Sequence, residues 1–107
     1  MIVATTEGLP GRPVSRVLGL VRGNTIRARH LGRDVQAVIR NIAGGEIREY
    51  TKMMAESREQ AIDRMIEEAR HMGADAVIGV RFTTSMVMSG AAEIMCYGTA
   101  VTLKEEP

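Results

Sequence analysis

The chain has 107 residues, 45% of them apolar and 25% charged, which is the composition of one ordinary globular domain spanning residues 1–107. Its 14 basic and 13 acidic residues give a formal net charge of +1, so no overall field draws it to nucleic acid or to an anionic membrane. No apolar run approaches the roughly 20 residues of a membrane-spanning helix. The single cysteine, Cys96, excludes an intrachain disulfide, and together these features predict a cytoplasmic protein.

The N-terminal third predicts short strands separated by turns. Ile2 to Thr5 favours a first strand, which ends at a segment rich in glycine and proline. Val14 to Val21 predicts a second strand, and Thr25 to Arg29 the returning strand of a hairpin. Gly23 and Asn24 would form its turn, because both residue types adopt positive φ readily.

Two helices are predicted in the middle of the chain. Apolar residues at helical spacing indicate a short helix over Leu31 to Ile42. A longer amphipathic helix is predicted over Glu46 to Met72, with Gly73 as its C-terminal stop. Ser57 begins an internal capping pattern that would allow a break, but no proline or glycine interrupts the segment, and we expect one continuous helix.

The C-terminal third predicts a pair of strands, Ala76 to Thr84 and Ala92 to Leu103, joined by a loop over Met86 to Gly90. A hairpin centred near Ser89 places Arg81 opposite Tyr97. Strict alternation in the first strand puts two sets of residues on opposite faces. They are Ala76, Ile78, Val80 and Phe82, against Val77, Gly79, Arg81 and Thr83.

The last strand is apolar on both faces. One face carries Ile94, Cys96 and Ala100, and the other carries Met95, Tyr97, Val101 and Leu103. The long helix covers one face, and we expect a neighbouring subunit to cover the other. The predicted fold class is therefore α+β, an antiparallel sheet covered on one face by a long amphipathic helix plus a short one, in a homo-oligomer.

The order of motifs along nearly the whole chain resembles the YbjQ-like family of small bacterial and archaeal proteins. The segments that carry this resemblance are Gly19 to Thr25, Asn41 to Glu46, Tyr50, Met65 to Ala69, Gly73 to Phe82 and Tyr97 to Val101. The resemblance implies a fold similar to dodecin subunits and assembly into pentameric rings. The family is uncharacterised and is often labelled "putative heavy-metal-binding".

The metal label finds little support in the sequence. A soft-metal site would be expected to carry a close pair of cysteines, and this chain has only Cys96. His30 and His71 are far apart in sequence and are weak candidates. We expect Cys96 to be a small buried apolar residue, and no cofactor is predicted. A metal ion shared between the subunits of a ring stays an alternative.

A basic run comprises Arg22, Arg27, Arg29, His30 and Arg33. Such a cluster could bind phosphate or RNA, but aromatic stacking partners are nearly absent. Surface arginines on a solvated hairpin are the favoured interpretation, and nucleic-acid binding is not expected.

Arg81 lies on an otherwise apolar strand and needs a partner, such as Glu93 or a carboxylate of a neighbouring subunit. The candidate ligand-binding or interface residues are Arg22, Asn24, Arg81 and Tyr97. No catalytic residues are identified, because the serines have no nearby histidine motif. The leading hypothesis is a non-enzymatic oligomer that binds a small ligand or partner at subunit interfaces. The alternatives are a heavy-metal-binding protein and a small enzyme with a composite interface site.

Overall fold

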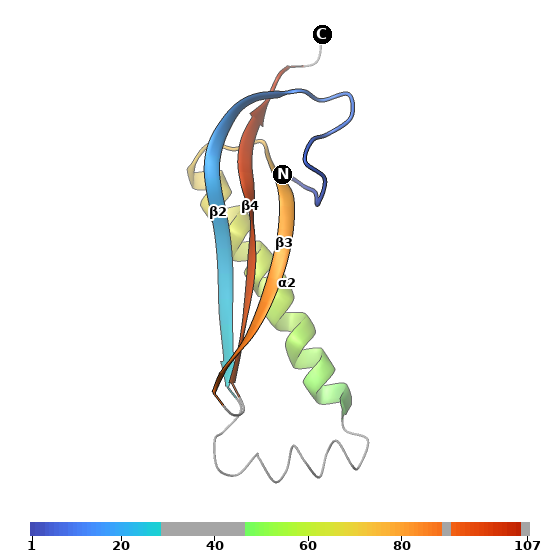
Figure 1. Ribbon diagram of the computed structural model, residues 1–107, viewed down its shortest axis with the longest axis vertical. Helices are drawn as coiled ribbons and strands as arrows, with labels where there is room; N and C mark the ends of the chain where they lie inside the picture. Colours follow the sequence, from blue (N-terminus) through green and yellow to red (C-terminus); the bar gives the residue numbers. More distant parts are fainter. Residues whose placement is uncertain (29–46, 89–90, 106–107) are drawn as a thin grey trace.

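The computed structural model describes residues 1–28, 47–88 and 91–105 as four strands and one helix (Figure 1). The elements are β1 (Ile2–Val3), β2 (Val14–Ala28), α2 (Ile47–His71), β3 (Ala76–Met88) and β4 (Ala91–Leu103).

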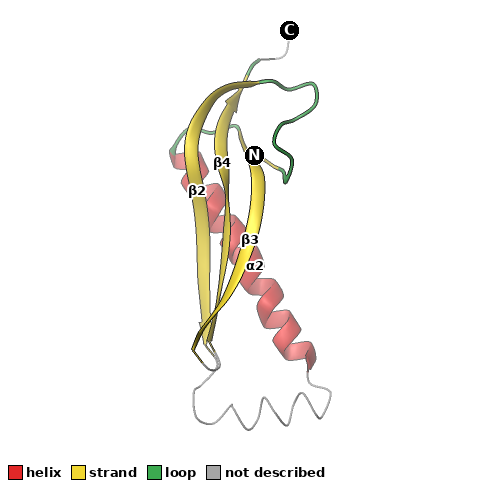
Figure 2. Ribbon diagram, in the orientation of Figure 1, coloured by secondary structure: helices red, strands yellow, loops and turns green. Residues whose placement is uncertain are grey.

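The strands form one sheet in the order β1-β3-β4-β2, with the helix packed against one of its faces (Figure 2). β4 lies at the centre and pairs antiparallel with β2 and with β3, whereas the short β1 pairs parallel with β3. The predicted α+β class is confirmed, and the parallel β1 makes the sheet mixed. The predicted short helix over Leu31 to Ile42 lies outside the described residues.

α2 is continuous through Ser57, as expected from the absence of glycine and proline. Ser57 is buried against β2, where its hydroxyl accepts a hydrogen bond from Nε of Arg27 at 3.0 Å. Its carbonyl accepts one from the hydroxyl of Thr25 at 3.3 Å. The serine that resembles an internal cap therefore attaches the helix to the sheet.

The C-terminus of α2 is closed by Gly73, as predicted. Gly73 has a φ of 79° and donates to the carbonyl of Arg70, while Ala74 donates to the carbonyl of Ala69. These two bonds satisfy carbonyls of the last helical turn and turn the chain back toward β3.

β2 corrects the predicted hairpin, because residues 14–28 form one strand that pairs with β4 from Val14 to Ala28. Gly23 lies inside this strand and faces α2. A Cβ built at Gly23 would lie 2.5 Å from the backbone nitrogen of Met65 and 2.8 Å from Cβ of Arg64. Glycine is therefore needed at position 23 for the close approach of a helix, and not for a turn.

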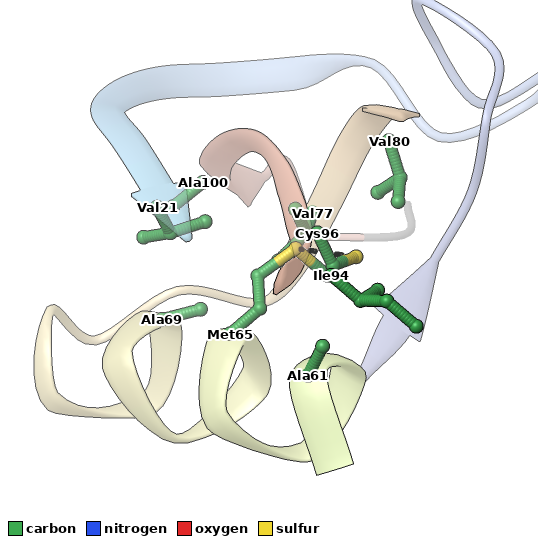
Figure 3. Packing of buried hydrophobic residues seen from close by; sticks show 9 residues of the cluster. All are labelled: Val21, Ala61, Met65, Ala69, Val77, Val80, Ile94, Cys96 and Ala100. Atoms are coloured by element: carbon green, nitrogen blue, oxygen red, sulfur yellow. Dashed lines mark hydrogen bonds between the residues drawn. The ribbon is translucent and has the colours of Figure 1, made fainter. Parts of the chain in front are cut away.

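The main core fills the space between α2 and the sheet (Figure 3). Ala61, Met65 and Ala69 follow one another along the helix and are fully buried. Their partners on the strands include Val21, Val77, Val80, Ile94, Cys96 and Ala100. The predicted assignment of Ile94, Cys96 and Ala100 to the covered face is thus confirmed.

A second cluster lies on the opposite face of the sheet and corrects the expectation that a neighbouring subunit covers all of this face. Val101 and Leu103 are buried there with Ala76 and Ile78, and Leu9 and Val14 pack against them. The N-terminal segment of the same chain therefore covers this end of the face, so Val101 and Leu103 need no neighbouring subunit.

A bulge in β3 breaks the predicted alternation. The register shifts between Ile78 and Arg81, and Gly79 has a φ of 62°. The extra residue places Val80 on the same face as Val77, in the main core. β3 also continues to Met88, beyond the predicted end at Thr84.

We expect Gly23→Ala to lower the free energy of unfolding by about 3 kcal/mol, because the atoms that its methyl group meets are helix backbone and cannot rotate away. Urea unfolding monitored by circular dichroism measures this change. Gly8→Ala is the matched control and should change the value by less than about 0.5 kcal/mol, since nothing lies within 4 Å of a Cβ there. Equal effects of the two substitutions would contradict the assigned contact.

Candidate functional site

The face of the sheet opposite α2, called here the outer face, carries a row of three polar side chains. Tyr97 of β4 is directly paired with Arg22 of β2 on one side and with Arg81 of β3 on the other. Residues paired in this way share a face, with Cβ atoms about 5 Å apart between neighbours. The predicted placement of Arg81 opposite Tyr97 is confirmed, and the structure adds Arg22 to the same row.

Arg22 is directed outward because its neighbours Val21 and Gly23 are buried beneath α2. Its side chain is exposed and makes no hydrogen bond or ion pair to another described residue. An arginine in this position keeps all its donors available to a ligand.

Within its own chain, Arg81 is held by backbone carbonyls. One of its terminal nitrogens donates to the carbonyl of Thr5 and to that of Val80, both at 2.8 Å. Of the two predicted partners, Glu93 is wrong, since its carboxylate instead accepts a hydrogen bond from the amide of Asn24 at 3.4 Å, and a carboxylate of a neighbouring subunit stays a prediction. Because no described carboxylate neutralises Arg81, its positive charge stays on the outer face.

Asn24 lies two residues beyond Arg22 and also faces outward. Its carbonyl accepts a hydrogen bond from Arg64 of α2 at 2.6 Å. All four predicted candidates, Arg22, Asn24, Arg81 and Tyr97, therefore gather on one face of three adjacent strands. Because a hairpin is predicted at Gly23 and Asn24, the sequence does not place Arg22 beside Tyr97. A single long strand over residues 14–28 would have predicted this position.

Apolar side chains flank the row. Leu20 and Ile26 of β2 are 61% and 60% exposed, and Met95 of β4 is half-buried. Exposed apolar side chains around two arginines and a tyrosine are typical of a binding surface. Such surfaces provide apolar contact area together with a few polar groups that orient the ligand. Two guanidinium groups attract an anion, but neither serves as a nucleophile or as a general base at neutral pH.

The metal candidates are not brought together. Cys96 is fully buried in the main core, where its thiol donates to the sulfur of Met65 at 3.5 Å (Figure 3). His71 is exposed at the end of α2, 3.7 Å from Oε1 of Glu67, and His30 lies outside the described residues. In the described part of the chain, no three histidine, cysteine, aspartate or glutamate side chains gather as metal ligands would.

Burial also opposes metal binding by Cys96. Desolvation raises the pKa of the Cys96 thiol, so the group stays protonated at neutral pH. Metals bind the thiolate, and forming it here would leave a charge in an apolar core. The predicted role of Cys96 as a small buried residue agrees with this environment.

The basic run is divided between the two faces of the sheet. Arg27 points toward α2, where it donates to Ser57 and, at 2.6 Å, to Oε1 of Gln60. Arg22 points to the outer face, and Arg29, His30 and Arg33 lie outside the described residues. The described arginines of the run therefore do not form one basic patch.

Within residues 47–71, the described helix lacks the length of apolar sequence that would cross a bilayer.

Comparison with known proteins gives a consistent family. A family model described as "YbjQ_1: Putative heavy-metal-binding" matches residues 1–104. A "UPF0145 protein" of Methanosarcina acetivorans is 57% identical over 94% of this chain and 95% of its own, and one of Archaeoglobus fulgidus is 56% identical over 97% and 96%. A crystal structure of a protein of unknown function of the DUF74 family from Pediococcus pentosaceus has a TM-score of 0.71. It is 15% identical and covers 97% of this chain and 98% of its own, so it supports the fold alone.

We expect the purified protein, prepared without a histidine tag, to bind neither Zn²⁺ nor Cu⁺ with submicromolar affinity at pH 7, because the buried thiol of Cys96 stays protonated. Titration against a competing chelator measures this. A tight, near-stoichiometric titration that is lost in Cys96→Ser would contradict the assignment of this residue to the core.

Proposed function

Because this chain belongs to the YbjQ_1 family, we propose that it is a non-enzymatic cytoplasmic homo-oligomer that binds a small anionic ligand where its subunits meet. Five subunits are the number that the resemblance implies. The observation that carries this proposal is the row Arg22–Tyr97–Arg81 on the outer face.

The charge of this row supports an anion as the ligand. Arg22 and Arg81 lie on either side of Tyr97, about 10 Å apart at two strand spacings, so an anion bound over Tyr97 would have a positive charge on both sides. A phosphate or carboxylate group would supply the negative charge and would accept hydrogen bonds from the planar guanidinium group of either arginine. The phenol of Tyr97, at the middle of the row, adds a hydrogen-bonding group.

The exposed apolar residues support assembly. Leu20, Ile26 and the half-buried Met95 surround the row, and a partner that covers them would remove water from the arginines as well. A charge-assisted hydrogen bond strengthens when water is excluded. Ligand binding and subunit association would therefore support each other at this face.

The two alternative functions are less well supported by the described residues. For the metal, the family description is the only argument, since Cys96 is buried and protonated and His71 lies elsewhere. For an enzyme, the relatives carry names without an activity, and the outer row contains groups that hold charge but none that activates a nucleophile.

We expect Arg22→Ala to weaken the binding of inorganic phosphate by about 10-fold or more, because a hydrogen bond to a charged group contributes about 1.5–3 kcal/mol. Isothermal titration at low salt measures the affinity, and light scattering on the same samples checks that assembly is kept. Tyr97→Phe should give a smaller loss, since it removes one neutral donor.

Arg70→Ala is the matched control, because Arg70 is an exposed arginine in the last turn of α2, away from the row. This variant should bind phosphate as the unmodified protein does. Equal losses in Arg22→Ala and Arg70→Ala, or no phosphate binding at low salt, would contradict the assigned site.

A further inference from the structure

Arg81 is the arginine of the row that is attached to another part of its own chain. Its nitrogen Nη1 donates to the carbonyl of Thr5 and to that of Val80, both at 2.8 Å, so both hydrogens of this nitrogen are used. One acceptor belongs to the N-terminal residues and the other to β3, and together they fix the plane of the guanidinium relative to the sheet. The remaining donors, on Nε and Nη2, contact no other described residue.

These remaining donors lie on one side of the guanidinium group, and that side can bind two oxygens of a carboxylate or phosphate at once. Arg81 is exposed, so a ligand can reach this side. Arg22, across Tyr97, makes no hydrogen bond to another described residue and has to be ordered when a ligand binds. The row therefore combines one arginine whose orientation is fixed before binding with one whose orientation is not.

The carbonyl of Thr5 is held in place by the neighbours of Thr5 in the chain. The carbonyl of Ala4 accepts a hydrogen bond from the amide of Val80 at 3.1 Å, and the carbonyl of Thr6 accepts one from the amide of Gly79 at 2.7 Å. Thr5 thus lies between two residues that are bonded to β3. The position of its carbonyl is therefore set by the backbone on both sides.

The bulge in β3 makes this attachment possible. In a regular strand, successive N–H groups point to opposite sides, so only alternate residues donate to a neighbour on one side. At the bulge, where Gly79 has a φ of 62°, the consecutive amides of Gly79 and Val80 both donate to residues 2–6. The glycine two positions before Arg81 therefore allows the N-terminal residues to hold its side chain.

Residues 2–6 are held to the rest of the fold by few contacts. β1 has only two residues and pairs with β3 at Ala76 and Val77 (Figure 1). Ile2 is 41% exposed, and its amide lies 3.4 Å from the carbonyl of Asp75, which is a long hydrogen bond. Segments with few buried contacts open locally at a lower cost than the core does. We therefore expect residues 2–6 to exchange between a docked and an open state.

We propose that Thr5 is a positioning residue of the anion site, and that the docking of residues 2–6 and the binding of an anion at the row favour each other. With these residues docked, Arg81 is already ordered, so the ligand does not have to order it. A bound anion in turn polarises the guanidinium and strengthens its bonds to the two carbonyls. Such coupling is reciprocal, because each event changes the equilibrium of the other by the same factor. This inference rests on the proposed function and specifies how the N-terminal residues regulate its site.

Hydrogen exchange with and without inorganic phosphate tests the coupling directly. The reporting amides are those of Ala4, Gly79 and Val80, because their hydrogen bonds join the N-terminal residues to β3. We expect saturating phosphate to slow their exchange by about 5-fold or more, relative to chloride at the same ionic strength, which is the lower end of usual coupling factors. The amide of Lys104, which donates to the carbonyl of Pro13 at 2.9 Å, is the internal control and should exchange at an unchanged rate.

Two alanine variants distinguish the arginines of the row, each compared at its own saturating phosphate concentration. Arg22→Ala should keep the slower exchange, because Arg81 still connects the anion to the carbonyl of Thr5. Arg81→Ala should lose the slower exchange while phosphate still binds weakly, since Arg22 makes no hydrogen bond to residues 2–6. Circular dichroism and light scattering on the same samples check that fold and assembly are kept.

Each outcome bears on a separate part of the proposal. Slower exchange in Arg81→Ala, as large as in the unmodified protein, would overturn the positioning role of Thr5. Phosphate binding that leaves the three reporting amides unchanged, or that slows Lys104 equally, would overturn the coupling and leave the proposed anion site standing. Absence of phosphate binding at low salt would reject the anion site itself, and this inference with it.

Discussion

The close contact between α2 and β2 at Gly23 determines how the rest of the molecule is arranged. With no side chain at this position, the helix backbone at Ala61 and Met65 approaches the strand directly, and Ser57 bonds to Thr25 and Arg27 farther along. This contact fixes α2 over β2 and the central β4. α2 also covers Val77 and Val80 of β3, whereas Arg81 to Met86, in the other half of that strand, are exposed.

Among the described residues, a further segment covers the sheet at one of its ends. The N-terminal segment packs Leu9 and Val14 on the outer face and closes a second small core, and the carbonyl of Thr5 holds the guanidinium of Arg81. Farther along the strands, the outer face presents two arginines and a tyrosine among apolar side chains. The proposed site and the proposed interface are thus the parts of the sheet that neither α2 nor the N-terminal segment covers.

The sequence predicted the features that depend on local pattern. The extent of α2, its stop at Gly73 and the pairing of Arg81 with Tyr97 follow from periodicity and hairpin geometry. It did not predict features set by distant contacts. Gly23 was interpreted as a turn residue, because the helix that requires it lies about 40 positions later in the chain. The bulge at Gly79 and the cover that Leu9 gives to Val101 depend likewise on segments that meet only in the fold. The gathering of the candidate residues could be predicted only in part. Hairpin geometry placed Arg81 opposite Tyr97, but Arg22 could be placed beside Tyr97 only once β2 was known to be one long strand.

The central claim is that the uncovered half of the sheet is an interface between copies of this chain. The molar mass of the unmodified protein at micromolar concentration, measured by light scattering after size-exclusion chromatography, tests it most directly. The account predicts a single species whose mass is a fixed multiple of the 11.7 kDa chain, with five as the expected number. A species of 11.7 kDa under the same conditions would contradict it.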